Sequence, residues 1–189
     1  MSRYTGPTNK LFRNYGVKDL SNRKLTSSMR QHASGQHGSV RKKLSEYAIH
    51  LNEKQKIRLT YLVSEKQFVR YYNEAARRKG VTGTILLQLL ESRLDNILFR
   101  AGFGITRKQT RQIVNHGDVL VNDKKVDIPS YLVKPGDVIT VKSKSAKYVK
   151  DVMEMIDMAC APAWMTIESE ALKITCDSIP EREELAPEI

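Results

Sequence analysis

The sequence predicts an α+β fold, in which a helical N-terminal module precedes a module built from a small antiparallel sheet and helices. Three observations indicate this fold class. Apolar residues recur at three- and four-residue intervals between about residue 45 and residue 116, which is the period of an amphipathic helix. After Gly117 they come in short runs separated by turn residues, as in strands. The chain of 189 residues, 40% of them hydrophobic, is also long enough to bury a core.

Residues 1–44 form a basic N-terminal extension without a sustained hydrophobic period. A flexible bend is predicted at Gly35-Gln36-His37-Gly38, and the basic run Arg41-Lys42-Lys43 follows it. We expect this segment to become ordered only against its partner, because it is basic and lacks an apolar period. The changes of pattern divide the remaining chain into a helical module, a sheet-containing module and a tail, at residues 45–91, 92–145 and 146–189.

The helical module contains one stretch that is both apolar and basic. Tyr61, Phe68, Tyr72 and Ala75 recur at helical spacing and share one face of the predicted helix. This predicts that Tyr72 packs into the core. For Tyr71, both packing and stacking on an exposed base stay open. The basic residues of this stretch, which would follow an RNA backbone, are Lys66, Arg70, Arg77, Arg78 and Lys79.

The next stretch, from Leu86 to Ala101, predicts two shorter helices with a bend at Ser92 and a C-cap at Gly102. Four charged residues lie close together within it. The pairing of acids with neighbouring bases is more consistent with their spacing than a catalytic acid and base. The expected partners are Glu91 and Asp95 on one side and Arg93 and Arg100 on the other.

A short helix from Arg107 to His116 follows, because Thr106 and Gln109 form a capping box and Gly117 ends the helix. The segments after it alternate between strands and one helix. They are a strand at 119–121, a turn at 122–124, strands at 125–126 and 138–141, a helix at 147–160, short strands at 164–167 and 172–175, and an acidic end at 180–189.

The charge is distributed unevenly. The formal net charge is +11, yet residues 1–150 carry 30 Lys and Arg against 11 Asp and Glu, whereas residues 151–189 carry 2 against 10. A polyanion is therefore expected to meet the first part of the chain. The sequence has no apolar stretch long enough for a membrane span and no secretory signal, which predicts a soluble, non-exported protein. Cys160 and Cys176 are expected to be reduced thiols.

The most prominent basic cluster lies on the helix that begins at Arg107. Arg107, Lys108 and Arg111 are expected to leave the core and face phosphates, since Thr110 and Ile113 supply the packing. The adjoining hairpin would extend this surface with His116, Asn122, Lys124 and Lys125. The alternative is a merely solvated surface, and the charge asymmetry of the chain favours RNA binding.

Neither a metal site nor a catalytic centre is predicted. The four histidines lack ligand spacing, and the sequence has no phosphate-binding glycine loop and no nucleophile elbow. An RNA-modifying enzyme that uses a small RNA-binding module for targeting would need a separate catalytic domain, and the acidic tail is too short for one. A free RNA-binding regulator of translation stays open as an alternative.

Landmarks along nearly the whole chain resemble the family of small-subunit ribosomal protein four, of bacterial or organellar type. The N-terminal landmarks are Met1 to Pro7, Gly35 to Gly38, Glu53 to Lys56 and Tyr71 to Arg77. The run from Ser92 to Asn96, through Val121-Asn122, to Pro135-Gly136-Asp137 resembles the RNA-binding module named after that protein. This module also occurs in pseudouridine synthases and tyrosyl-tRNA synthetases, so the N-terminal landmarks make the resemblance specific.

The resemblance implies a structural protein of the small ribosomal subunit in the cytoplasm or an organelle. Such a protein binds the rRNA of that subunit directly, nucleates assembly of its body, contacts the fifth ribosomal protein of the subunit, influences accuracy together with the fifth and twelfth, and lies near the mRNA entry. No membrane or DNA partner is implied. Some members bind zinc through cysteines near the N-terminus, and this chain has none there. No metal or other cofactor is therefore expected.

Charge, spacing and the resemblance together nominate a set of RNA-binding residues. They are Arg3, Tyr4, Lys10, Arg13, Arg41, Lys42, Lys43, Lys54, Arg58, Lys66, Arg70, Arg77, Arg93, Arg107, Lys108, Arg111, His116, Asn122 and Lys124.

Overall fold

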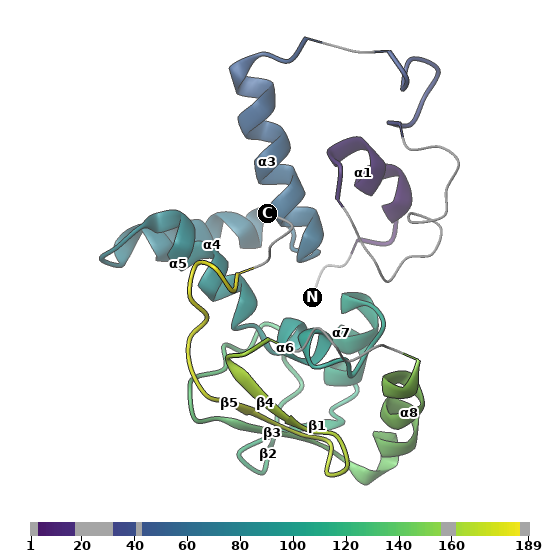
Figure 1. The fold of residues 1–189 in the computed structure, drawn as a ribbon, viewed down its shortest axis with the longest axis vertical. Coiled ribbons are helices and arrows are strands. Elements are labelled where there is room, and N and C mark those ends of the chain that lie inside the picture. Colours follow the sequence, from purple (N-terminus) through teal and green to yellow (C-terminus); the bar gives the residue numbers. More distant parts are fainter. Residues whose placement is uncertain (1–3, 18–31, 41–42, 156–161, 186–189) are drawn as a thin grey trace. The chain divides into compact units, whose positions relative to one another are not determined.

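The computed structural model of the chain describes residues 4–17, 32–40, 43–155 and 162–185 (Figure 1). The chain forms two compact units. The first comprises Met1–Arg70 with Ala186–Ile189, and the second comprises Tyr71–Leu185. The boundary between the units falls within helix α4 (Glu65–Arg77), upstream of the division at residue 91 that the change of pattern predicts.

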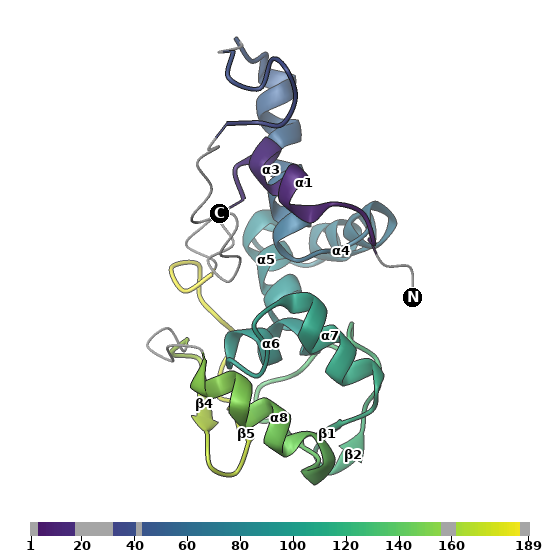
Figure 2. The ribbon, with the colours of Figure 1, turned by 90° about the vertical axis from the view of Figure 1, so that its right-hand side faces the viewer.

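The first unit contains a helix that the sequence analysis did not predict. Helix α1 (Thr8–Tyr15) packs beside helix α3 (Glu46–Thr60), as Figures 1 and 2 both show. Phe12 and Val17 are buried with Leu59 of α3. A few apolar residues are therefore enough to stabilise a short helix when a second helix covers them. The expectation that the extension has no structure without a partner is thus wrong for these residues. Its residues 1–3, 18–31 and 41–42 lie outside the described part of the chain.

Helix α3 begins where the sequence predicts. The Ser45 hydroxyl caps it by accepting a hydrogen bond from the Ala48 backbone N–H at 3.3 Å. In α4 the prediction for Tyr72 is wrong, because this residue is 52% exposed whereas Phe68 and Ala75 are buried. The reason is angular: Tyr71 and Tyr72 lie on opposite sides of the face that Phe68 and Ala75 define. The buried face extends toward Tyr71, which is partly buried.

In the second unit the predicted helices are confirmed. Helix α5 (Thr82–Glu91) ends at Ser92, whose hydroxyl donates a hydrogen bond to the Gln88 carbonyl at 2.7 Å, and helix α6 (Leu94–Arg100) follows at once. Gly102 has a φ of 76°, as expected just after a helix end. Thr106 caps helix α7 (Arg107–Asn115) by accepting a hydrogen bond from the Gln109 N–H at 3.3 Å.

The sheet has five strands in the order β2-β1-β3-β5-β4, and all neighbours are antiparallel. The hairpin turn between β1 and β2 has only two residues, because Asn122 and Asp123 both have positive φ angles, 48° and 62°. Lys124 therefore belongs to a strand and not to the predicted turn. The strands are β1 (Val119–Val121), β2 (Lys124–Lys125), β3 (Val138–Val141), β4 (Met165–Glu168) and β5 (Lys173–Cys176).

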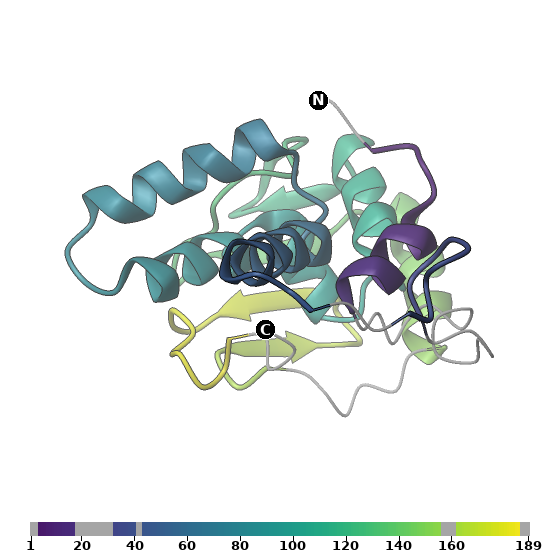
Figure 3. The ribbon, with the colours of Figure 1, turned by 90° about the horizontal axis from the view of Figure 1, so that it is seen from above.

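The C-terminal strands join the same sheet. Strand β5 pairs with β3, with Ile139 opposite Ile174, and β4 runs antiparallel beside β5 (Figure 3). The sheet thus unites residues that the sequence analysis divided at residue 145. Helix α8 (Ser143–Glu154) connects β3 to β4 and begins earlier than predicted, while the predicted residues Ile156 to Cys160 lie outside the described residues.

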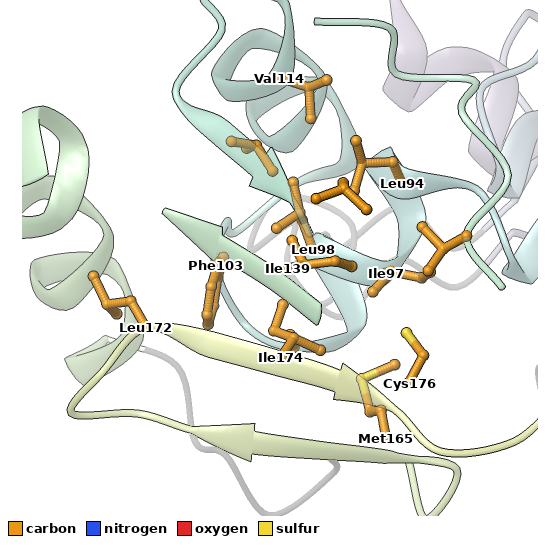
Figure 4. Packing of buried hydrophobic residues seen from close by; sticks show 14 of the residues in the cluster. Leu94, Ile97, Leu98, Phe103, Val114, Ile139, Met165, Leu172, Ile174 and Cys176 are labelled. Carbon is orange, nitrogen blue, oxygen red and sulfur yellow. The ribbon is translucent and has the colours of Figure 1, made fainter. Parts of the chain in front are cut away.

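The core of the second unit lies between the helices and the sheet. Helices α6 and α7 lie over one face of the sheet, and α8 lies beside it (Figures 1 and 2). Leu98 and Phe103 meet Ile139 and Ile174 of the central strands (Figure 4). None of the helices in the described residues is long and apolar enough to cross a membrane.

Cys176 belongs to this core, and burial raises the pKa of its thiol to about 12, with Asp137 and Asp177 nearby acting in the same direction. The thiolate is the reactive form, so at pH 8 the native thiol has roughly a thousandfold less of it than an ordinary cysteine. We expect Cys176 in a Cys160→Ser variant to react with iodoacetamide at pH 8 at least about a hundredfold more slowly when native than in urea. Equal rates in the two conditions would show that the thiol is accessible.

Candidate nucleic-acid interface

In the first unit, the candidate RNA-binding residues differ in their exposure to solvent and in their pairing with acids. Lys10 and Lys43 are exposed, as is Tyr4, whereas Arg13 is partly buried on α1. The remaining candidates of this part of the chain either pair with an acid or lie outside the described residues. Lys54 and Arg58 of α3 pair with Glu65 at 2.7 Å and 3.4 Å, and Arg3, Arg41 and Lys42 are outside the described residues.

Helix α4 carries further basic residues whose side chains are exposed. Lys66 and Arg70 are exposed, and so is Arg77 near the end of the helix. Arg78 pairs with Glu74 one turn earlier, at 3.2 Å, which is an ordinary exposed ion pair.

Helix α7 presents its three basic residues differently from the prediction. Lys108 is exposed, but Arg107 and Arg111 are held by partners in the protein. The Arg107 Nε donates to the Asn96 side-chain oxygen at 2.9 Å, and its guanidinium lies 4.2 Å from the centre of the Phe99 ring. The expectation that all three side chains leave the core is therefore wrong for the two arginines. Thr110 and Ile113 are buried, as predicted.

Asp95 is the partner of Arg111 and also of Arg93. Arg93 donates through Nε and Nη2 to the two Asp95 carboxylate oxygens at 3.0 Å and 2.7 Å, and through Nη1 to the Tyr71 hydroxyl at 2.7 Å. Arg111 reaches the same carboxylate at 2.6 Å. Burial acts to lower the pKa of the Arg93 guanidinium, but Asp95 and Tyr71 raise it above the usual value, so Arg93 stays charged.

Arg93 is therefore removed from the candidate set. Its side chain is 2% exposed, so a phosphate cannot reach it in this structure, and its contacts are with Asp95 and Tyr71. The contact with Tyr71 also resolves the question that the sequence left open. Tyr71 accepts a hydrogen bond from a buried arginine, which favours a packing role over stacking on a base.

Glu91 organises a second polar cluster beside the first. It pairs with Arg100 at 2.7 Å and accepts a hydrogen bond from the Asn96 side chain, whose oxygen in turn binds Arg107. The predicted pairing of Glu91 and Asp95 with Arg93 and Arg100 is confirmed, with Arg111 as a further partner. Every buried side-chain nitrogen and oxygen in the described residues has a hydrogen-bond partner, so the clusters are fully satisfied.

The hairpin next to α7 has both exposed and structural residues. His116 at the end of α7 and Lys124 and Lys125 on β2 are exposed. Asn122 uses its amide within the protein: the nitrogen donates to Asp137 at 2.8 Å and the oxygen accepts from the Val138 N–H at 2.9 Å. The Asn122 side chain thus links the turn between β1 and β2 to the turn that precedes β3. In the sequence, this structural role is indicated by the position of Asn122 in the predicted turn.

Helix α8 supplies residues that the sequence analysis missed. Gln109 of α7 donates a hydrogen bond to the Tyr148 hydroxyl, which ties α8 to the basic helix. Lys144 and Lys147 are exposed on α8 and lie within one turn of Tyr148. The signal that could have found them is the density of lysines from residue 142 to residue 150, which the sequence analysis placed partly before the helix.

The exposed lysines of α7, β2 and α8 can each attract a phosphate through charge. The described residues contain no group of three or more His, Cys, Asp or Glu able to hold a metal ion. We call Lys108, Lys124, Lys125, Lys144 and Lys147 the lysine surface of the second unit.

Comparison with known proteins gives two family matches that follow one another. Residues 3–91 match the family described as ribosomal protein S4/S9 N-terminal domain, and residues 92–139 match the S4 domain. The chain is also similar to curated proteins named small ribosomal subunit protein uS4. It is 48% identical to the one from Gloeobacter violaceus over 98% of this chain and 93% of that protein. The values are 47%, 100% and 94% for Mycoplasmopsis synoviae, and 48%, 100% and 95% for Hahella chejuensis.

Proposed function

Because the chain belongs to the small ribosomal subunit protein uS4 family, we propose that it is a structural component of the small ribosomal subunit that binds rRNA directly. The observation that carries this proposal is the identity of nearly half of the residues with these relatives over almost the full length of both chains. A structural role is supported by the naming of the relatives as ribosomal proteins and by the pairing of Glu91 and Asp95, the buried acids of the described residues, with arginines.

The distribution of charge supports rRNA as the partner. In the second unit the lysine surface is exposed on α7, β2 and α8. Residues 151–189 carry a net negative charge, so they should repel an RNA backbone and leave RNA binding to the basic part of the chain. On the first unit, exposed Lys10, Lys43, Lys66 and Arg70 form the corresponding candidates. RNA binding through phosphates needs such exposed cations and no particular reaction centre.

The family suggests finer roles, and these belong to the proposal too. They are an early contribution to assembly of the subunit body, contact with the fifth small-subunit protein, an influence on accuracy together with the fifth and twelfth, and a position near the mRNA entry. The protein would act in the ribosome of the cytoplasm or of an organelle. We also propose a basic extension, a helical module and an RNA-binding module whose sheet includes β4 and β5. The two family matches, which meet between residues 91 and 92, support a division at that point alone.

Sedimentation tests the proposed function directly. We expect the tagged protein, expressed near its natural level, to migrate in a sucrose gradient with the small subunit at about one copy per subunit, because a structural component occupies one site. Dissociation of subunits by lowered magnesium should leave it with the small subunit. Protein found only at the top of the gradient, or on a minor fraction of subunits, would contradict the proposal and favour a free regulator.

A further inference from the structure

Helix α8 carries an exposed aromatic side chain whose polar end is already bound within the protein. Tyr148 is 49% exposed, and its hydroxyl accepts a hydrogen bond from the Gln109 side chain of α7. Gln109 is itself held at its other end, because its side-chain oxygen accepts a hydrogen bond from the Ile105 backbone N–H at 2.8 Å. What Tyr148 offers to a partner outside the protein is therefore an apolar ring with an ordered position.

The Tyr148 ring does not belong to the face by which α8 packs on the sheet. Val149 and Met153 make that contact and are buried in the core of the second unit. Tyr148 lies about 100° around the helix from Val149, and it is neither a buried nor a partly buried member of this core. The exposed ring is therefore free for a contact other than core packing.

The surroundings of Tyr148 are mainly cationic. Residues 142–151 carry four Lys against one Asp, and Asp151 lies one turn after Tyr148. Lys144 lies one turn before Tyr148 on the same side of α8, and Lys147 directly precedes it in the chain. Lys108 directly precedes Gln109 on α7, and all three lysines are exposed. An exposed aromatic ring accompanied by several cations is the combination that binds single-stranded nucleic acid.

We propose that Tyr148 is a stacking platform for an unpaired base of the rRNA, whose adjoining phosphates meet Lys144 and Lys147. A base in a loop or bulge can be splayed out to stack on an aromatic ring, whereas a base within a duplex is already stacked on its neighbours. Because Gln109 orders the ring before RNA arrives, stacking costs little further side-chain freedom. This inference rests on the proposed function and deepens it, since it assigns a single-stranded nucleotide to α8.

Three substitutions at Tyr148 separate stacking from packing and from the hydrogen bond. Tyr148→Ala should bind RNA about five- to a hundredfold more weakly, the usual range for the loss of one stacked base. Tyr148→Phe keeps the ring and should bind within about threefold of wild type, since it loses only one hydrogen bond. Tyr148→Leu keeps an apolar side chain without a ring, so it should bind as weakly as Tyr148→Ala. Wild-type affinity of Tyr148→Leu, or an affinity of Tyr148→Phe as low as that of Tyr148→Ala, would overturn the stacking role.

The salt dependence of binding distinguishes a lost base contact from a displaced helix. A stacked base carries no charge, so Tyr148→Ala should keep the wild-type slope of log affinity against log salt. A displaced α8 would also lose the phosphate contacts of its lysines, and each lost contact would lower the slope by roughly 0.7 to 0.9. Weaker binding with a lower slope would therefore contradict the proposal.

Met155→Ala is the matched control. Met155 is 75% exposed directly after α8, beside Glu154 and away from the lysines, so its removal also deletes an exposed apolar side chain. This variant should bind RNA as tightly as wild type. A loss equal to that of Tyr148→Ala would show that the effect is not specific to the ring, and the proposal would fail.

The measurement is the affinity of the full chain for an in vitro transcript of a bacterial small-subunit rRNA, made at a temperature where the fluorescence of the buried Trp164 shows each variant to be folded. Chemical probing at saturating protein should reveal a base that wild type protects and Tyr148→Ala does not, and this base should be unpaired in the free transcript. Unchanged affinity of Tyr148→Ala, or a difference in protection that is absent or confined to paired nucleotides, overturns the proposal. Should Tyr148→Ala be unfolded, Tyr148→Leu decides in its place. Failure of the wild-type protein to bind the transcript contradicts the proposed function itself.

Discussion

Replacement of Arg93 by Met should lower the free energy of unfolding of the second unit by about 3–5 kcal/mol, which is the usual effect of removing one partner from a buried ion pair. Methionine fills much of the same volume, so the loss reports the polar contacts and not a cavity. The substitution removes two hydrogen bonds to Asp95 and one to Tyr71. It leaves a buried carboxylate with Arg111 as its remaining ion-pair partner among the described residues.

The measurement is urea unfolding followed by the fluorescence of Trp164, the single tryptophan of the chain, which is buried in the core of the second unit. Arg78→Met is the control, because Arg78 pairs with Glu74 on the exposed surface of α4. Exposed pairs of this kind contribute about 0.2–1 kcal/mol. If both variants unfolded at the same urea concentration, the buried pair would contribute no more than an exposed one.

Replacement of three residues of the lysine surface, Lys108, Lys144 and Lys147, by Ala should flatten the plot of log affinity for rRNA against log salt by about two to three units. Each phosphate contact releases condensed counterions and accounts for roughly 0.7 to 0.9 of the slope. The three side chains are exposed, so the free energy of unfolding should change by less than about 1 kcal/mol. Arg107 and Arg111 are not included, because they hold partners inside the protein.

Lys173→Ala is the control for this prediction. Lys173 lies on β5 within the acidic C-terminal region and pairs with Glu168 at 3.3 Å, so it should not contact RNA. Its salt dependence should equal that of the wild type. A triple variant with the wild-type slope and an unchanged fold would show that α7 and α8 are solvated surfaces and that the RNA contacts lie elsewhere on the chain.

The local signals of the sequence predicted most elements of the second unit. Ser92 and Thr106 act through side-chain hydrogen bonds to backbone groups within four residues, so their effects are visible in a short window of sequence. The same is true of the spacing that pairs Glu91 with Arg100. Helix α1 was missed because its stability depends on burial against α3, which begins some thirty residues after it ends.

By itself, the sequence determined the fold class, the ends of most helices and the charge asymmetry that points to RNA. Each of these depends on residue type and on neighbours a few positions away. The tertiary structure alone decided which basic side chains are available to a partner. Lys108 and Arg111 look alike in the sequence, yet one is exposed and the other is bound to Asp95, sixteen residues earlier. Likewise, residues 165–176 join the sheet only through pairing with β3. Both the ion pair and the strand pairing join segments that are distant in the sequence. The ion pair in particular forms only where the fold brings a buried charge to its counter-charge.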